Sequence, residues 1–158
     1  MHCFLTGEIQ VGKSTLIRRF LQEKRLTPCG FSTLWRGGEL LIAPYGKTGG
    51  EVAAVRGGGA VTAYPAVFDR LSRALLTPVP GADILIMDEL GFLENDAHEF
   101  QQQVLARLDG ELSVLGVIKP QRSKFLDAVR AHPGVTVAEV TPENREDVFL
   151  RLCKESKW

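Results

Sequence analysis

The stretch Gly7–Ser14, GEIQVGKS, has the residue types and the spacing needed to bind phosphate. It fits the pattern G-x-x-x-x-G-K-[ST], in which backbone N–H groups of a glycine-containing loop point at phosphate oxygens ahead of a helix. Lys13 is placed to reach the terminal phosphates and the Ser14 hydroxyl to bind Mg²⁺. An apolar strand before the loop and a helical pattern after it supply the required context. The other residues predicted to contact the nucleotide here are Glu8, Ile9, Gln10, Val11, Gly12 and Thr15.

Two adjacent carboxylates follow the apolar run Asp83–Met87, in a segment that resembles a Walker B strand. Asp88 could hold Mg²⁺ through a water molecule, and Glu89 could orient and deprotonate an attacking water. An isolated Asp-Glu pair at the end of a strand is usually a solvated turn. The phosphate loop in the same chain favours the catalytic interpretation, so Glu89 is the predicted base and Lys13 a predicted catalytic cation.

The adjacency of the two acids also predicts a strand order. P-loop hydrolases of the additional-strand class carry the base next to the Mg²⁺ acid, and their sheets place one strand between the phosphate loop and Walker B. Ser113–Ile118 is the candidate for that strand. Lys119 at its end is then either a sensor of the γ-phosphate or a solvated loop lysine.

Five more residues carry weaker predictions. Arg36 is either an arginine delivered in cis to the γ-phosphate or an exposed hairpin charge. Glu94 is either a supporting acid of the site or the polar end of a loop. Asn144 and Arg145 follow the last strand, where P-loop proteins often contact the base, although such residues also suit a helix start. Trp35 is expected to serve packing.

The elements that must position these residues alternate between apolar strands and amphipathic helices, which is typical of an α/β protein with a mainly parallel sheet. Strands buried on both faces are predicted at His2–Thr6, Asp83–Met87, Ser113–Ile118 and Val135–Val140. Helices are predicted at Lys13–Lys24, Phe68–Leu76, Ala97–Leu108, Lys124–Ala131 and, with Thr141 as N-cap and Pro142 at the first helical position, up to about Cys153.

Residues 30–65 break the alternation, because they are glycine-rich and contain short alternating segments in place of a helix. Gly37-Gly38 between two apolar stretches is a two-residue hairpin signal. We therefore expect an antiparallel β insertion between the first and second helices.

The length and composition of the chain limit its domain number, its binding partners and its cellular compartment. A chain of 158 residues, 44% hydrophobic and 24% charged, suits one globular domain over residues 1–158. With 19 basic and 19 acidic side chains, no net field favours nucleic acid or an acidic membrane. Cys3, Cys29 and Cys153 have neither disulfide nor zinc spacing, and no leader or membrane span is indicated, so we expect a cytoplasmic protein. The predicted partner is a nucleoside triphosphate such as ATP or GTP, and the oligomeric state stays open.

Three other functions share parts of the same residue pattern. Asp88–Gly91 fits the D-x-x-G of regulatory GTPases, but the N-K-x-D guanine reader of those proteins has no counterpart. A nucleotide or nucleoside kinase uses the same scaffold but needs an acceptor pocket and a cationic lid, and no arginine-rich lid stands out. A nucleotide-binding regulator, whose hydrolysis is incidental, remains the third possibility.

Four motifs together resemble the nucleoside-triphosphatases first described from thermophiles, a family whose animal member is called cancer-related nucleoside-triphosphatase. They are Leu5–Gly7 with Val11–Ser14, then Gly30–Thr33, Asp88–Glu94 and Thr141–Arg145. The resemblance covers nearly the whole chain and implies a three-layer, RecA-like P-loop fold with Mg²⁺-dependent hydrolysis of several nucleoside triphosphates. The chain departs from the family pattern at Leu34-Trp35, where an acidic residue and valine are usual, at Phe92, where lysine is usual, and at Glu8–Gln10, where the loop is usually rich in proline and glycine.

Overall fold

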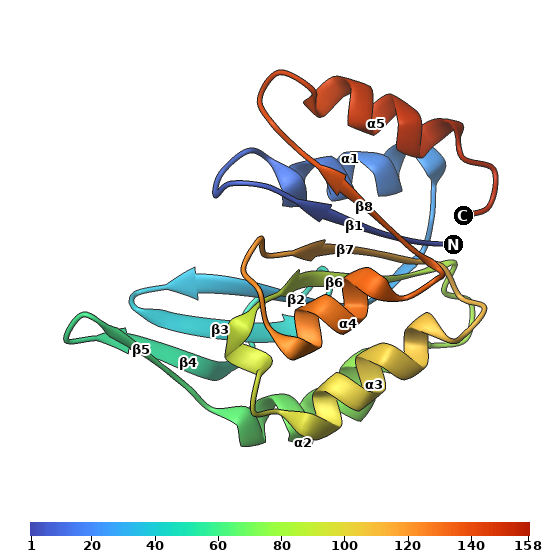
Figure 1. Ribbon diagram of the computed structural model, residues 1–158. Helices are drawn as coiled ribbons and strands as arrows, with labels where there is room; N and C mark the ends of the chain where they lie inside the picture. The colour runs from blue at the N-terminus through green and yellow to red at the C-terminus, as the bar shows by residue number, and fades with distance from the viewer.

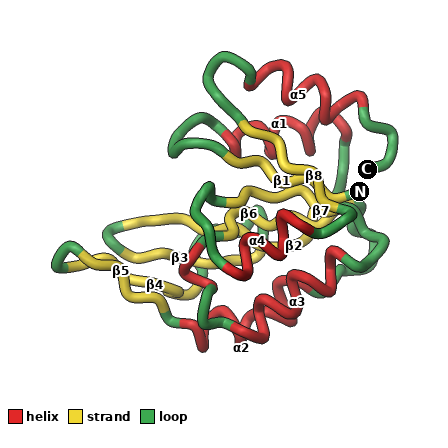
Figure 2. The backbone as a smooth tube through the Cα atoms, viewed as in Figure 1, coloured by secondary structure: helices red, strands yellow, loops and turns green.

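One eight-stranded sheet runs through the computed structural model, which describes residues 1–158, and its strand order is β5-β4-β3-β2-β6-β7-β1-β8 (Figures 1 and 2). The strands are β1 (His2–Thr6), β2 (Pro28–Arg36), β3 (Glu39–Pro44), β4 (Glu51–Gly57), β5 (Ala60–Ala63), β6 (Ile84–Leu90), β7 (Val114–Ile118) and β8 (Val135–Glu139). The helices are α1 (Lys13–Lys24), α2 (Pro65–Leu76), α3 (His98–Leu108), α4 (Lys124–Ala131) and α5 (Arg145–Lys154), with a short 3-10 turn η1 (Phe92–Glu94). None of the helices combines the length and apolar character needed to cross a bilayer.

The central part of the sheet is parallel, as predicted. β7 pairs with β1 on one side, where Val117 lies opposite Leu5, and with β6 on the other, where Val117 lies opposite Asp88. β7, which ends one residue before Lys119, therefore separates the phosphate-loop strand from the Walker B strand. This confirms the predicted additional strand.

Alternating residues of the central strands build two hydrophobic clusters, one on each face of the sheet. Along β6, Leu85 and Met87 join the cluster beneath α2, α3 and α4, while Ile84 and Ile86 join the one beneath α1 and α5. The result is the three-layer arrangement of a P-loop fold.

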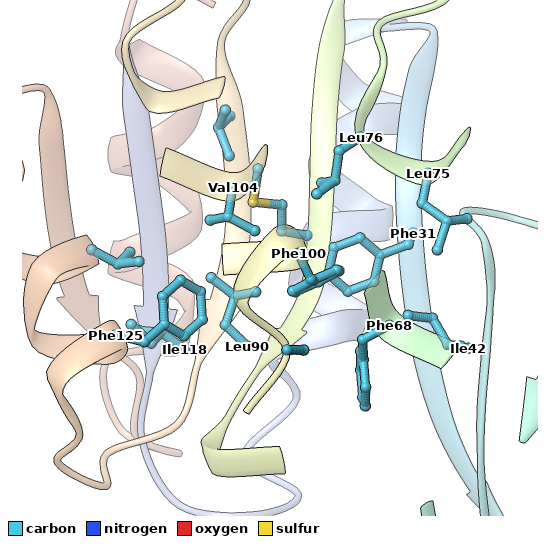
Figure 3. Close-up of a cluster of buried hydrophobic side chains, with 14 of the residues drawn as sticks. Phe31, Ile42, Phe68, Leu75, Leu76, Leu90, Phe100, Val104, Ile118 and Phe125 are labelled. Atoms are coloured by element: carbon cyan, nitrogen blue, oxygen red, sulfur yellow. The ribbon is translucent and has the colours of Figure 1, made fainter. Parts of the chain in front are cut away.

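The first of these clusters is organised around aromatic rings (Figure 3). Phe100 of α3 meets both Phe31 of β2 and Phe68 of α2 edge to face, with ring centroids 5.5 Å apart in each pair. These contacts tie the strand that begins the insertion to two helices of the central fold.

The predicted antiparallel insertion is confirmed, with one difference. β2, β3, β4 and β5 pair antiparallel in chain order, but β2 begins at Pro28 and its first half pairs parallel with β6. The insertion is therefore a continuation of the main sheet. Gly30 marks the junction, since a Cβ there would lie 2.0 Å from the carbonyl oxygen of Ile86 at a φ of +108°. A glycine in a strand conceals the strand from pattern analysis.

Helix boundaries were predicted well for α1 and α4, whereas the start of the last helix was wrong. α5 begins at Arg145, because Thr141 and Asn144 close a separate turn first. The Thr141 hydroxyl accepts from the Asn144 N–H at 3.2 Å, and the Asn144 side-chain oxygen accepts from the Thr141 N–H at 2.8 Å. Thr141 therefore caps a turn and not the helix.

Candidate active site

The phosphate loop joins β1 to α1 at the carboxyl end of the parallel strands, the edge beyond which the hairpin tips of the insertion also project (Figure 1). Gly12 is the N-cap of α1 with a φ of +89°, in the left-handed region. A Cβ at Gly12 would lie 2.9 Å from a terminal guanidinium nitrogen of Arg145. Glycine is needed here both for the backbone angle and for the close approach of α5.

Lys13 is buried and folds back along the loop. Its ammonium donates hydrogen bonds to the carbonyl oxygens of Gly7, at 2.9 Å, and of Glu8. Burial lowers the pKa of Lys13, an effect opposed by the nearby Glu89 carboxylate. The ammonium thus stands at the mouth of the loop with partners that an anion could replace.

Ser14 and Asp88 join the loop to the Walker B strand. The Ser14 hydroxyl donates to the Asp88 carboxylate at 3.1 Å, although the two residues lie 74 positions apart. Burial raises the pKa of Asp88 to about 6, and the Ser14 hydrogen bond opposes the rise only in part. A buried carboxylate with so little compensation, beside a hydroxyl, is a donor pair that suits a hard divalent cation.

Glu89 and Lys119 meet beside that pair at the ends of β6 and β7. Their charged groups lie 3.5 Å apart, and each side chain is a little over a quarter exposed. Glu94 is buried behind them and accepts a hydrogen bond from the Gly91 N–H at 3.0 Å. Burial raises the pKa of Glu94 to about 8, so its carboxyl is a neutral acid over most of the physiological range.

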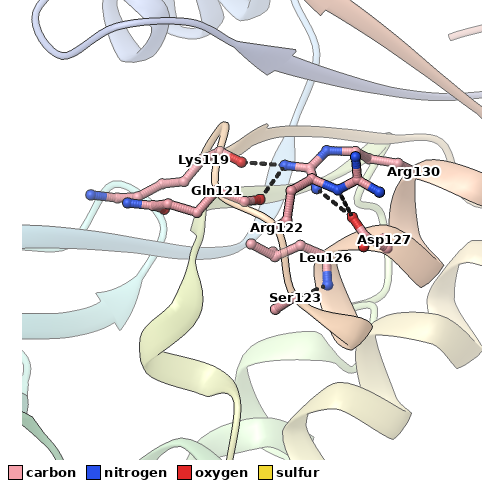
Figure 4. Close-up of polar contacts among 7 residues, drawn as sticks. All are labelled: Lys119, Gln121, Arg122, Ser123, Leu126, Asp127 and Arg130. Carbon is pink, nitrogen blue, oxygen red and sulfur yellow. Dashed lines mark hydrogen bonds and ion pairs between the residues drawn. The ribbon is translucent and has the colours of Figure 1, made fainter.

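The loop that carries Lys119 is held from α4 (Figure 4). The Arg130 guanidinium donates to the carbonyl oxygens of Lys119 and Gln121 and pairs with Asp127 at 3.1 Å. Lys119 extends away from this network, and its side chain lines the cleft. Sequence reasoning did not identify this anchor, because Arg130 lies on an ordinary amphipathic helix.

A cleft of about 1060 Å³ brings most of the predicted site residues together. Those that line it are Gly7, Glu8, Ile9, Gln10, Gly12, Lys13, Ser14, Thr15, Asp88, Glu89 and Lys119. Val11 belongs to the loop but packs its side chain into the core under α1. Only its backbone is therefore available to a ligand.

Asn144 and Arg145 do not line this cleft. The Asn144 amide is engaged, because its nitrogen donates to the Glu139 carbonyl at 2.9 Å and its oxygen closes the turn before α5. Arg145 is exposed and lies against Gly12. The base contacts predicted for these two residues stay predictions, with Arg145 the better placed of the two.

The insertion forms one wall of the cleft, and the sequence did not indicate which of its residues would line that wall. Thr33 and Trp35 of β2 line it, together with Leu40 of β3 and Arg56 of β4. Arg36 is exposed and is absent from the lining, because consecutive strand residues point to opposite faces of a sheet. Trp35 packs against the core as expected and also lines the cleft. The catalytic role predicted for Arg36 stays a prediction, and the placement of Arg36 gives it no support.

The P-loop nucleoside-triphosphatase class is defined by a glycine-containing loop between a strand and a helix, facing two carboxylates at the end of a second strand. Here both features occur in a three-layer fold whose sheet places one strand between those two strands. A family model described as NTPase matches residues 50–153. The nucleoside-triphosphatase THEP1 of Pyrococcus abyssi is 30% identical over 174 residues, which cover 98% of this chain and 92% of that protein. The chain belongs to this NTPase family, and the resemblance inferred from its motifs is confirmed.

Solved structures agree on the fold. The crystal structure of THEP1 from Aquifex aeolicus superposes with a TM-score of 0.79 at 22% identity, covering 96% of each chain. The solution structure of a human cancer-related nucleoside triphosphatase gives a TM-score of 0.73 at 26% identity, over 96% of this chain and 94% of that one. THEP1 of Thermotoga petrophila matches over 76 residues only, 48% of this chain and 42% of that protein.

Proposed function

We propose that this chain is a Mg²⁺-dependent nucleoside-triphosphatase that hydrolyses ATP, GTP and other nucleoside triphosphates to the diphosphate and phosphate. The main observation that supports this proposal is the hydrogen bond between Ser14 and Asp88, because it links the phosphate loop to the strand that bears Glu89. Membership of the NTPase family and the names of the THEP1 relatives support the same reaction. The three free cysteines support a reducing compartment, the cytoplasm.

Binding falls to the loop and to Lys13. The backbone N–H groups of residues 8–15 precede and begin α1, where the helix dipole favours negative charge. The Lys13 ammonium already points back at this loop, so an incoming β- or γ-phosphate replaces its contacts with the carbonyls of Gly7 and Glu8. Exchanging neutral carbonyls for charged oxygens strengthens each hydrogen bond.

Ser14 and Asp88 are the residues that would hold Mg²⁺. No group of three or more His, Cys, Asp or Glu side chains in the structure could enclose a metal, which suits an ion that takes its remaining ligands from water and phosphate. When bound, the ion neutralises charge on the phosphate oxygens. The Ser14 hydroxyl would supply a neutral oxygen ligand, and Asp88 would supply negative charge to hold the ion beside the loop.

Glu89 takes the proton in the chemical step. A water oxygen forms a bond to the γ-phosphorus while the bond from that phosphorus to the β,γ-bridging oxygen breaks, and Glu89 accepts a proton from the water. The electron pair of the broken bond stays on the diphosphate. Lys119, whose ammonium lies 3.5 Å from the Glu89 carboxylate, would bind a γ-phosphate oxygen and keep that carboxylate oriented.

The strand order favours hydrolysis over phosphoryl transfer to a second substrate. A kinase of this scaffold would gain support if β1 paired directly with β6, but β7 lies between them. The acid next to Asp88 then has a water-activating role available to it. No observation favours a regulator that merely binds nucleotide.

Phosphate release from the four common nucleoside triphosphates, with and without Mg²⁺, tests the proposal. Glu89→Gln should keep the affinity for a non-hydrolysable analogue and lower kcat by about 10²-fold or more, because an amide takes no proton from water. Lys13→Ala should lose analogue binding, measured by calorimetry.

The matched control is Glu111→Gln, since Glu111 is an exposed acid that precedes the amino end of β7, away from the cleft. It should leave kcat unchanged. Turnover that appears only when a nucleoside acceptor is added would replace the proposal with a kinase, and wild-type turnover in Glu89→Gln would move the base elsewhere.

A further inference from the structure

The guanidinium of Arg56 is the one cationic group that the insertion brings into the cleft. Its central carbon lies 4.4 Å from the centroid of the Trp35 ring, so the planar cation stacks on the indole. Arg19, Arg70, Arg73, Arg122 and Arg130 are all committed to carboxylates. The Arg56 guanidinium has no ion pair, and the backbone N–H of Arg56 donates to the Gly38 carbonyl at 2.7 Å.

Two cavities place this free cation close to the reacting groups. Arg56 and Trp35 line the large cleft with Lys13, Ser14 and Asp88. They also line an adjoining cavity of about 110 Å³ together with Glu89, Glu94 and Lys119. Arg56 and the predicted base Glu89 therefore line the same two cavities.

Glu89 and Lys119 line the same cleft as the phosphate loop, so a triphosphate bound there as proposed above would extend its γ-phosphate toward them. The wall beyond those two residues is the one formed by β2, β3 and β4, from which Arg56 projects. As the bond to the diphosphate breaks, negative charge builds on the bridging oxygen, while the charge of the transferring phosphoryl group is spread over its three equatorial oxygens. A guanidinium held at this wall serves that charge with its forked donors.

We propose that Arg56 is an arginine finger supplied in cis, and that Trp35 is the positioning residue that holds it. The proposal rests on the triphosphatase function proposed above and adds a catalytic residue to it. Stacking fixes the plane of the guanidinium while leaving all its side-chain N–H donors free for phosphate, which a salt bridge would not do.

Three variants test the assignment, with Arg36→Ala as a matched control because Arg36 lies on the same hairpins but faces away from the cleft. Arg56→Ala should lower kcat by about 10² to 10³-fold and leave the Kd of a non-hydrolysable analogue within about threefold. It should also lose binding of the diphosphate with aluminium fluoride, which mimics the transferring phosphoryl group. Arg56→Lys should rescue kcat only in part, because lysine lacks the planar fork.

Trp35→Ala should lower kcat in the wild-type background but have no further effect in Arg56→Ala, as expected of a residue that acts through the arginine. Unchanged kcat in Arg56→Ala, or a loss of analogue affinity equal to the loss of kcat/KM, would overturn the assignment. A fall in kcat for Arg36→Ala alone would transfer the role to Arg36. Absence of turnover in the wild type would overturn the triphosphatase proposal itself, so the two failures are distinguishable.

Discussion

At the scale of single residues, the site contains ionisable groups whose burial disfavours their charged form. Asp88 and Glu94 are both buried carboxyls whose pKa values are raised by desolvation, yet they differ in what they can bind. Asp88 opens onto the cleft and suits a cation, whereas Glu94 is held by the Gly91 N–H behind Glu89. One acid is therefore available for a metal, and the other is a neutral hydrogen-bonding group that supports the loop.

Glu94 should make the protein less stable as the pH rises. Its pKa is about 8 in the folded chain against an ordinary value of 4.5, so between these values the unfolded chain loses a proton that the folded chain keeps. The free energy of unfolding then falls with rising pH, by at most about 1.4 kcal/mol per pH unit for one proton. Glu94→Gln should remove this contribution, because its amide is neutral at every pH and its oxygen can still accept from Gly91.

Urea unfolding of both proteins at pH 5 and pH 8.5 measures the effect. The stability of Glu94→Gln relative to the wild type should improve by a few kcal/mol at the higher pH. An equal pH dependence in the two proteins would show that Glu94 is ionised at the same pH in the folded and unfolded chains.

At the scale of elements, the carboxyl ends of parallel strands and the loops after them carry the chemistry, and neighbouring helices hold those loops in place. α4 does so for Lys119 through Arg130, which binds two loop carbonyls at once (Figure 4). The insertion differs, because its contribution comes from side chains within its strands and not from the loops after them. It extends the sheet beyond the site and forms one wall of the cleft. What the insertion contributes to the site depends on which of its side chains face the cleft.

Arg130→Ala should therefore act on turnover through Lys119. Losing the guanidinium frees the carbonyls of Lys119 and Gln121, at a cost of about 1 to 3 kcal/mol in stability, and loosens the loop. We expect kcat to fall in the same direction as in Lys119→Ala, and the double variant to be no slower than Lys119→Ala alone. Multiplied effects in the double variant would assign Arg130 a role independent of Lys119.

At the scale of the whole molecule, one sheet separates two hydrophobic clusters that share no side chain. The strands of the sheet contribute alternate residues to both, so neither face can lose its packing without disturbing the other. Phe100 anchors one cluster through Phe31 and Phe68, and Phe20 anchors the other, where it contacts Trp158 at 5.0 Å between ring centroids. We propose on this basis that residues 1–158 form a single cooperative domain.

Phe100→Leu in a Trp35→Phe background tests that proposal, because it alters one cluster while Trp158, then the one tryptophan of the chain, reports on the other. The substitution should cost about 1 to 3 kcal/mol, less than full truncation to alanine. Unfolding followed by tryptophan fluorescence and by far-ultraviolet circular dichroism should give coincident transitions, both shifted by the same amount. Separate transitions would show that the two faces unfold independently.

Local chemistry explains why the sequence alone determined so much. The phosphate loop is one run of eight residues, and Asp88 and Glu89 are adjacent, so spacing along the chain indicated their roles without any knowledge of the fold. Periodicity likewise predicted α1 and α4 and the parallel strands, because an element buried against its neighbours displays its contacts in its own pattern. Even the strand order followed from the adjacency of the two acids.

Only the tertiary structure decided which side chains of the insertion face the cleft. Arg36 and Arg56 are alike in sequence terms, but the pairing of β2 with β3 and of β3 with β4 places Arg56 beside Trp35 and turns Arg36 outward. A shift of one residue in a strand register exchanges the two faces of that strand, and register depends on contacts between residues far apart in the chain. The burial of Glu94 and the engagement of Asn144 in its own turn have the same origin. Each depends on what folds over the residue, which neighbouring residues in the sequence do not encode.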